Sequence, residues 1–222
     1  MLIYTAVFSK PDVLFNPTLP LPDIDKLCFT DMELQGESAY QAVSVQLDDS
    51  SGRRCQRRVK LYWPDIFNNY EYSLYLDSNV TLKADPRRFI NMLTAGSDIL
   101  VFRHCRRDCL YEEAQVCLDY GLAEQDAVAR QLEKYRVEGY PEHHGLFQGT
   151  IIFRRHTEAM REFSKAWLKE VMTFTARDQI SFPYVVWKLK EPMSLFSSSI
   201  LANPWFCWKG EHNSWASQFV KR

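Results

Sequence analysis

The stretch Tyr72–Val80 constrains this chain most, because a short apolar and aromatic run ends there abruptly in oxygen-bearing side chains. The run Tyr72-Ser73-Leu74-Tyr75-Leu76 is typical of a buried strand, and Asp77 and Asn79 follow it one residue apart. Alternate side chains of an extended segment point the same way, so both oxygens can face one ligand. Mg²⁺ and Mn²⁺ prefer oxygen ligands of this kind. The pattern therefore has two interpretations: a cation and diphosphate site at a sheet edge, or a turn that only ends the strand, since Asp, Ser and Asn are turn formers.

Length and composition favour one folded α/β domain. The chain has 222 residues, of which 46% are hydrophobic and 14% aromatic, enough for a sizeable core. The net charge of −1 argues against broad nucleic-acid binding. Basic residues nevertheless gather in two clusters, which are either solvated faces or sites that neutralise a diphosphate or an anionic acceptor. The clusters are Arg53, Arg54, Arg57, Arg58 and Lys60, and then Arg103, Arg106 and Arg107.

Three further patterns bear on compartment and metal type. No run approaches the roughly 18 to 20 apolar residues that span a bilayer, and Met1–Phe8 reads as a first strand rather than a signal peptide. The six cysteines contain no CxxC pair, so a structural zinc site has little support. Asn79-Val80-Thr81 is a glycosylation sequon on the candidate metal site, where a glycan would obstruct a ligand. We therefore expect a cytoplasmic protein without a membrane span.

The order of elements predicts a nucleotide-binding sheet, in which ligands lie at the carboxyl ends of the strands. Asp31 follows the second strand, where it would bind a base or ribose or serve as an ordinary loop acid. Pro64 is expected to end the first helix, and Asp108 and Asp178 are natural N-caps of later helices. The expected strands are Leu2–Phe8, Lys26–Asp31, Ala42–Leu47, Tyr70–Leu76, Asp98–Phe102 and Leu146–Phe153. The expected helices cover Ser50–Trp63, Pro86–Gly96, Asp108–Tyr135 with a break near Gly121, His156–Met172 and Asp178–Lys188.

Four segments in consistent order resemble one known family. They are YSLYLDSNV, FRHCRRDCLYEEA, HHGLFQGTIIFRRH and DQISFPYVVWK. Together they resemble the glycosyltransferase-like family of plant cell-wall and mucilage proteins and bacterial polysaccharide clusters, and the small glycosyltransferases of large algal viruses. The similarity runs from about Ile3 to Lys188. It implies a single GT-A domain over residues 1–222, a Rossmann-like mixed sheet flanked by helices that uses a nucleotide-sugar donor (UDP- or GDP-linked) and a glycan acceptor.

The resemblance also implies roles for individual residues. Asp77 and Asn79 match the DxD metal motif, and the Asn keeps an oxygen ligand but removes one negative charge. With His212 they would hold Mn²⁺ or Mg²⁺. Asp178 is the expected base of an inverting reaction, with Asp108 as second choice. The expected donor-binding residues are Ala6, Phe8, Asp31, Arg57, Lys60, Asp77, Ser78 and Lys209. The expected acceptor-binding residues are His104, His143, His144, Gln148 and Gly149.

Four alternatives to this interpretation stay open. The Asn in the motif suits a non-catalytic nucleotide-sugar or glycan-binding module of the same fold, and a retaining transferase is equally compatible. A metal-dependent hydrolase or phosphotransferase would need His143 and His144 close to Asp77 in space. An interaction scaffold would use exposed aromatic side chains near the C-terminus, namely Trp205, Trp208 and Trp215.

Overall fold

The computed structural model describes residues 1–9, 14–34, 36–46 and 51–208. Its strands are β1 (Leu2–Val7), β2 (Asp25–Thr30), β3 (Gln41–Ser44), β4 (Tyr72–Leu76), β5 (Val80–Leu82), β6 (Ile99–Arg103), β7 (Phe147–Arg155), β8 (Ser194–Leu195) and β9 (Phe206–Trp208). Its helices are α1 (Gly52–Leu61), α2 (Pro64–Asn69), the 3₁₀ helix η1 (Pro86–Met92), α3 (Leu110–Asp119), α4 (Gln125–Val137), α5 (Glu158–Thr173) and α6 (Asp178–Leu189).

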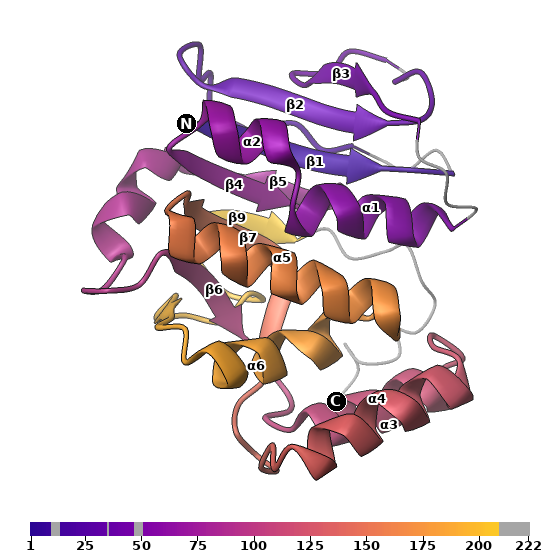
Figure 1. Cartoon of the computed structure of the whole chain (residues 1–222). Helices are drawn as coiled ribbons and strands as arrows, with labels where there is room; N and C mark the ends of the chain where they lie inside the picture. Colours follow the sequence, from indigo (N-terminus) through magenta and orange to yellow (C-terminus); the bar gives the residue numbers. More distant parts are fainter. Residues whose placement is uncertain (10–13, 35, 47–50, 209–222) are drawn as a thin grey trace.

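A mixed seven-stranded sheet forms the centre of the fold, in the order β3-β2-β1-β4-β7-β6-β8 (Figure 1). The first four strands of that order are parallel, whereas β7 runs antiparallel to both β4 and β6. The carboxyl end of β4 therefore lies beside the amino end of β7. This is the Rossmann-like mixed sheet flanked by helices that the sequence predicts, and the prediction of the fold class is confirmed.

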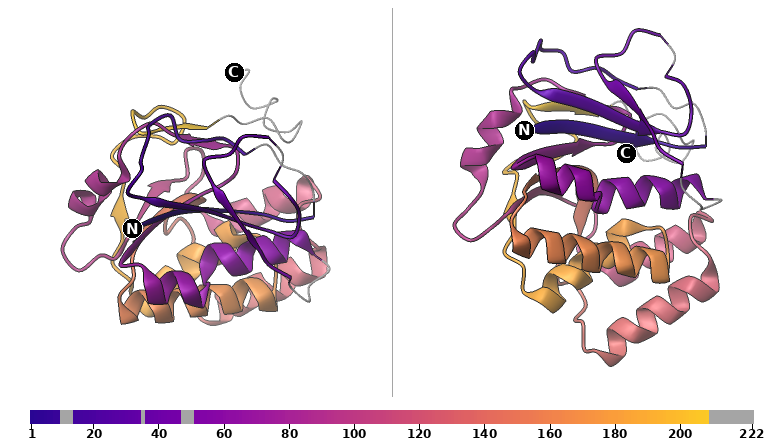
Figure 2. Two further views of the ribbon diagram at one scale, coloured as in Figure 1. Left: turned by 90° about the horizontal axis from the view of Figure 1, so that it is seen from above. Right: turned by 45° about the horizontal axis from the view of Figure 1, so that its top comes forward.

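The two faces of the sheet carry different layers (Figure 2). Helices α1, α2, α5 and α6 cover one face, while η1 and a small second sheet of β5 and β9 cover the other. Side chains of β1 alternate between the two cores: Leu2 and Tyr4 face the helices, and Ile3 faces the second sheet. This period of two is the expected result of an extended strand that is buried on both faces.

Several predicted boundaries are wrong for identifiable reasons. Pro64 begins α2 instead of only ending the preceding helix, because proline at the first helical position has no hydrogen bond to lose. The N-cap of α3 is Cys109 and not Asp108, and the N-cap of α6 is Arg177, so that Asp178 is the first residue of that helix. The segment after Pro86 forms a 3₁₀ helix.

Helices α3 and α4 lie side by side below α6, away from β1 and β2 (Figure 1). They are joined through Gly121, which has a positive φ of 62°. Helix α3 also packs against α6, and this contact brings its inner face to the end of the sheet where β4 stops. No helix among the described residues has the length and apolar character needed to cross a membrane.

Candidate active site

A cavity of about 650 Å³ opens where β4 ends and β7 begins. It is also lined by α1, the loop after β6, the inner face of α3 and the turn that follows, the start of α6, the loop with Ile200 and Leu201, and Trp208 of β9. It therefore lies at the carboxyl end of a parallel strand, where α/β sheets bind ligands. Its polar lining residues are Arg57, Lys60, Asp77, Asn79, His104, Arg106, Arg107, Glu113, Gln148, Thr150, Arg177, Asp178 and Gln179.

Asp77 and Asn79 form one wall of this cavity. The backbone N–H of Asp77 donates to the Thr150 carbonyl at 2.9 Å, and its carboxylate accepts a hydrogen bond from the Tyr75 hydroxyl at 2.8 Å. The Oδ1 atom of Asn79 is buried and has no hydrogen-bond partner among the described residues. A buried unpaired oxygen is costly unless a ligand satisfies it. An oxygen of this kind next to a carboxylate fits the donor set that Mn²⁺ or Mg²⁺ requires.

Asp178 lies in the same cavity, paired with two cations. Its carboxylate contacts Lys60 Nζ at 2.6 Å and Arg57 Nε at 3.2 Å, and all three side chains are at least nine-tenths buried. Burial raises the pKa of Asp178, but the charges of Arg57 and Lys60 outweigh burial and hold that pKa well below its ordinary range. The carboxylate is therefore ionised at every physiological pH.

Lys60 connects the two acidic positions. Its Nζ lies 3.8 Å from Asp77 Oδ1 as well as 2.6 Å from Asp178. Burial lowers the pKa of Lys60, although both carboxylates oppose that shift. Helix α1 delivers Arg57 and Lys60 from one face because they are three residues apart.

Gly149 on β7 leaves the space in which the Lys60–Asp178 pair forms. A Cβ atom at this position would lie 2.8 Å from Asp178 Oδ2 and 3.0 Å from Lys60 Nζ. Glycine weakens a strand interior and often marks close approach of another group. Here the neighbouring group is the ion pair itself.

A second charged group lines the cavity on the side of α3. Arg107 donates two hydrogen bonds to Glu113 Oε2, at 2.9 Å from Nε and 2.5 Å from Nη2. Arg177 Nη2 lies 3.9 Å from Glu113 Oε1. Glu113 is only 3% exposed, so this carboxylate is paired in the interior of the protein.

The structure gathers many of the predicted site residues in the cavity. These are Arg57, Lys60, Asp77, Asn79, His104, Gln148, Gly149 and Asp178. Others do not line it: Ala6, Phe8, Asp31, Ser78, Asp108, His143 and His144. Asp31 instead accepts the Ser9 N–H at 3.0 and 3.2 Å. Lys209 and His212 lie outside the described residues.

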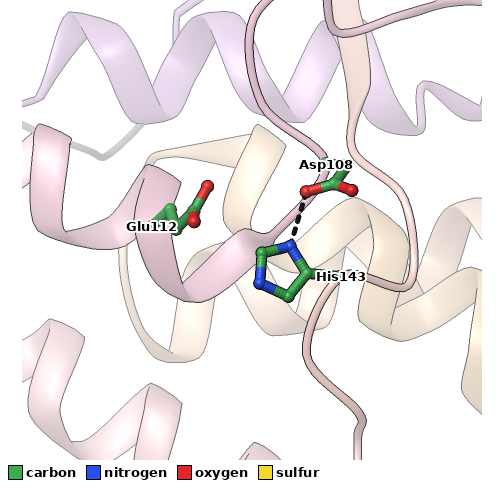
Figure 3. Close-up of side chains that lie close together, drawn as sticks. All are labelled: Asp108, Glu112 and His143. Carbon is green, nitrogen blue, oxygen red and sulfur yellow. Dashed lines mark hydrogen bonds and ion pairs between the residues drawn. The ribbon is translucent and has the colours of Figure 1, made fainter.

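Asp108 and His143 form an exposed pair at 2.7 Å, with Glu112 of α3 beside them (Figure 3). The hydrogen bond to Asp108 raises the pKa of His143. Neither His143 nor His144 lines the cavity that holds Asp77, and the hydrolase alternative therefore has no support from this geometry.

The sequence patterns do not predict four polar residues of the lining, namely Glu113, Thr150, Arg177 and Gln179. One available signal was Arg107 in a basic cluster six residues before Glu113. The burial of Glu113 beside the exposed Glu112 has no signature in the sequence.

The mixed sheet and the polar cavity at its carboxyl edge are the architecture of a Rossmann-like α/β protein with a ligand site. Residues 41–203 match the family described as TOD1/MUCI70, glycosyltransferase-like domain. The chain belongs to this family, as the resemblance of its motifs predicts. It is also similar to the probable hexosyltransferase MUCI70 of Arabidopsis thaliana, with 30% identity over 146 residues. That alignment covers 61% of this chain and 25% of the relative, so the similarity concerns about a quarter of the relative's length.

Proposed function

We propose that this chain is a glycosyltransferase that moves a sugar from a nucleoside diphosphate donor, UDP- or GDP-linked, to a hydroxyl of a glycan acceptor. One observation carries the proposal: Lys60 links Asp77, at the end of β4, to the buried carboxylate of Asp178 in a single cavity. Family membership and the similarity to a probable hexosyltransferase support the same reaction class.

Asp77 and Asn79 would hold Mn²⁺ or Mg²⁺ in this proposal. The unpartnered Oδ1 of Asn79 supports that role, because no protein group among the described residues satisfies it. A bound divalent ion would neutralise the negative charge that develops on the departing diphosphate. The roles of His212 as a further ligand and of Lys209 at the diphosphate remain predictions from the resemblance.

Arg57 and Lys60 would stabilise the same developing charge from the protein side, since fixed cations in a water-poor site act strongly there. Asp178 would take the proton of the acceptor hydroxyl. The acceptor oxygen then bonds to the anomeric carbon, the bond from that carbon to the phosphate oxygen breaks, and the nucleoside diphosphate leaves with the electron pair. Direct displacement of this kind inverts the anomeric configuration.

The two ion pairs of Asp178 favour a second candidate role. The Asp178 carboxylate is paired with Arg57 and Lys60, so it would position both cations to bind the diphosphate. In a retaining transferase, this positioning would be the whole role of Asp178. The two roles differ in what happens to donor affinity when the charge of Asp178 is removed.

Asp178→Asn separates these roles because the side chain keeps its size. If Asp178 is the base, transfer should fall by about 10² or more while donor affinity measured by calorimetry changes little. If it only positions the cations, donor affinity should fall together with the rate. The anomeric configuration of the product, read by NMR, distinguishes inversion from retention.

Nucleotide release by the wild-type protein is measured with a panel of UDP- and GDP-sugars and Mn²⁺, and it is the reference rate for the variant. Release of nucleotide identifies a transferase, whereas a binding module would bind the donor and release none. Transfer by the Asp178→Asn variant at the wild-type rate would remove Asp178 from both roles.

A further inference from the structure

The described lining of the cavity keeps an excess of positive charge after a nucleotide-sugar donor and its divalent ion have both bound. It contains five cationic side chains (Arg57, Lys60, Arg106, Arg107 and Arg177) and three carboxylates (Asp77, Glu113 and Asp178), an excess of two positive charges. A divalent ion and the diphosphate of the donor bring opposite charges of similar size. The excess therefore remains after both have bound, and it calls for a further anion.

Most charged side chains of the lining belong to one of two separate groups. Arg57 and Lys60 share Asp178, close to Asp77. Arg107 and Arg177 share Glu113 on the side of α3, and we call these three residues the Glu113 cluster. Counted with Asp77, the first group has two cations and two carboxylates and therefore no net charge. The Glu113 cluster has a net charge of +1, and Arg106 in the same lining adds the second positive charge. The first group serves the diphosphate in our proposal, and the Glu113 cluster has no assigned ligand.

The Glu113 cluster has hydrogen-bond donors that Glu113 does not use. Arg177 Nε is buried and has no hydrogen-bond partner among the described residues. The side chains of Arg107 and Arg177 are 21% and 15% exposed, against 4% for that of Glu113, so the cations and not the carboxylate face the open space. A guanidinium group presents its N–H donors in a planar fork that matches a carboxylate.

His104 adds a neutral donor beside this cluster. Its Nδ1 accepts the backbone N–H of Arg107 at 3.0 Å, which leaves the proton of the neutral ring on Nε2. Burial lowers the pKa of His104, so the ring is neutral at pH 7. Tyr120 and Leu201, two exposed large hydrophobic residues, line the same cavity and offer apolar surface to a sugar ring.

We infer that the Glu113 cluster is a subsite for the carboxylate of an acidic sugar, and that this sugar belongs to the acceptor. The inference rests on the proposed transferase function. The acceptor is favoured because Arg57, Lys60 and the Asp77–Asn79 pair already meet the charge of the donor diphosphate. Arg107 binds the carboxylate through the N–H groups that do not donate to Glu113. His104 Nε2–H binds a neighbouring oxygen, and the sugar ring lies against Tyr120 and Leu201.

The test compares two acceptors that differ in one group: an oligosaccharide ending in glucuronate, and the same oligosaccharide with its carboxylate reduced to an alcohol. The measured quantity is the ratio of kcat/KM for the acidic and the reduced acceptor. In the wild-type protein this ratio should exceed about ten, the scale of one hydrogen bond to a charged group.

Two variants should change the ratio in opposite directions. Arg107→Met removes one cation and should lower the ratio to near one. Glu113→Gln has nearly the same shape, removes the competing carboxylate and should raise the ratio. Damage to folding alone would affect both acceptors alike. Arg87→Met is the matched control, because Arg87 pairs with Asp85 on the surface, and it should leave the ratio unchanged.

Four outcomes would overturn the inference, and a separate measurement tests the proposed function. Equal use of both acceptors by the wild-type protein would overturn the inference, as would a shift of the ratio in the same direction in both variants. A loss of UDP affinity in Arg107→Met equal to its loss of acceptor preference would assign the Glu113 cluster to the diphosphate and also overturn it. The last such outcome is a wild-type protein that uses UDP-glucuronate better than UDP-glucose but uses the acidic and the reduced acceptor equally well. That result would assign the carboxylate to the donor and overturn the acceptor assignment. Nucleotide release from the donor, measured without acceptor, reports on the proposed function independently.

Discussion

Gly149 is the residue at which the smallest change should have a large effect. Its Cβ would lie 2.8 Å from Asp178 Oδ2, so an alanine there forces the carboxylate away from Lys60. We expect Gly149→Ala to lower transfer by about tenfold or more and to cost about 1–3 kcal/mol of unfolding free energy through overpacking. Steady-state kinetics and urea unfolding measure the two effects.

Gly96 supplies the control for that substitution. Nothing lies within 4 Å of the position where its Cβ would stand, but its φ of 80° strains any other residue. Gly96→Ala should therefore cost about 1 kcal/mol of stability and leave transfer intact. Equal transfer rates in the two variants would contradict the role of Gly149.

His156 should make stability depend on pH. Its Nδ1–H donates to the Tyr70 carbonyl at 2.6 Å and its Nε2 accepts from the Ser73 hydroxyl at 2.8 Å, so the ring is bound in its neutral form. Burial, assisted by the charge of Arg154, lowers the pKa of His156 from 6.5 to about 3. Between these values the unfolded chain binds a proton that the folded protein does not. Stability should thus fall as pH drops below 6.5, by about 2 kcal/mol at pH 5.

Urea unfolding at pH 7.5 and pH 5 measures this effect. His156→Gln should lose this part of the pH dependence. His143→Gln is the matched control: its pKa is raised by Asp108, so its removal should leave the acid destabilisation in place or enlarge it. An equal pH dependence in the wild-type protein and the His156→Gln variant would contradict the argument.

At the scale of elements, one side chain of β1 and one of β7 donate hydrogen bonds to the carbonyls of the last turn of α1. Arg154 is fully buried and has no described acidic partner; its Nη2 and Nη1 donate to the carbonyls of Lys60 and Leu61 at 2.6 and 2.9 Å. The Tyr4 hydroxyl donates to the Lys60 carbonyl at 3.0 Å and accepts a hydrogen bond from Arg154. The carbonyl end of a helix carries partial negative charge, which stabilises the arginine. These contacts fix the backbone from which Lys60 reaches the cavity.

Tyr4→Phe removes only the hydroxyl of this arrangement. We expect a loss of about 1 kcal/mol in stability and a few-fold rise in donor KM, because Lys60 is held less firmly. Tyr70→Phe removes a comparable bond, to Asp25, away from the cavity, and should leave donor KM unchanged. A donor KM for Tyr4→Phe equal to that of the wild-type protein would mean that packing alone fixes α1.

Most of the larger elements of this fold were predictable from local pattern. The apolar runs gave β1, β2, β4, β6 and β7, and Gly121 separated α3 from α4 as expected. The short strands β5, β8 and β9 were not predictable, since two or three residues carry no period. The antiparallel direction of β7 also has no local signature, because it depends on pairing with β4 and β6.

At the scale of the whole molecule, the site joins segments that local sequence does not relate. Asp77 and Asn79, which line the cavity, were predicted because they follow one strand directly, and Asp178 was predicted through family resemblance. The Glu113 cluster forms only because α3 packs against α6 and brings Glu113 to Arg177. Arg107 lies in the loop after β6, Glu113 on α3 and Arg177 at the N-cap of α6, so only the tertiary arrangement reveals the cluster.

Ligand binding should stabilise the whole chain through Asp77. A nucleoside diphosphate at 100 times its Kd, with Mn²⁺, adds about 2.7 kcal/mol to the unfolding free energy. For a domain of this size that corresponds to a rise in Tm of roughly 5–10 °C, measured by thermal shift. Asp77→Ala should abolish most of the rise because it removes a carboxylate of the proposed metal site, and chelation of Mn²⁺ should do the same to the wild-type protein.

Asp85→Ala distinguishes this effect from a general loss of charge. Asp85 is a surface carboxylate that caps η1 and pairs with Arg87, so its removal should lower the Tm of the free protein but preserve the rise on adding ligand. The two carboxylates thus differ in which state they stabilise: Asp85 acts on the free fold, and Asp77 on the complex. A full rise in Tm in the Asp77→Ala variant would show that nucleotide binds without the end of β4, and the proposed metal site would then be wrong.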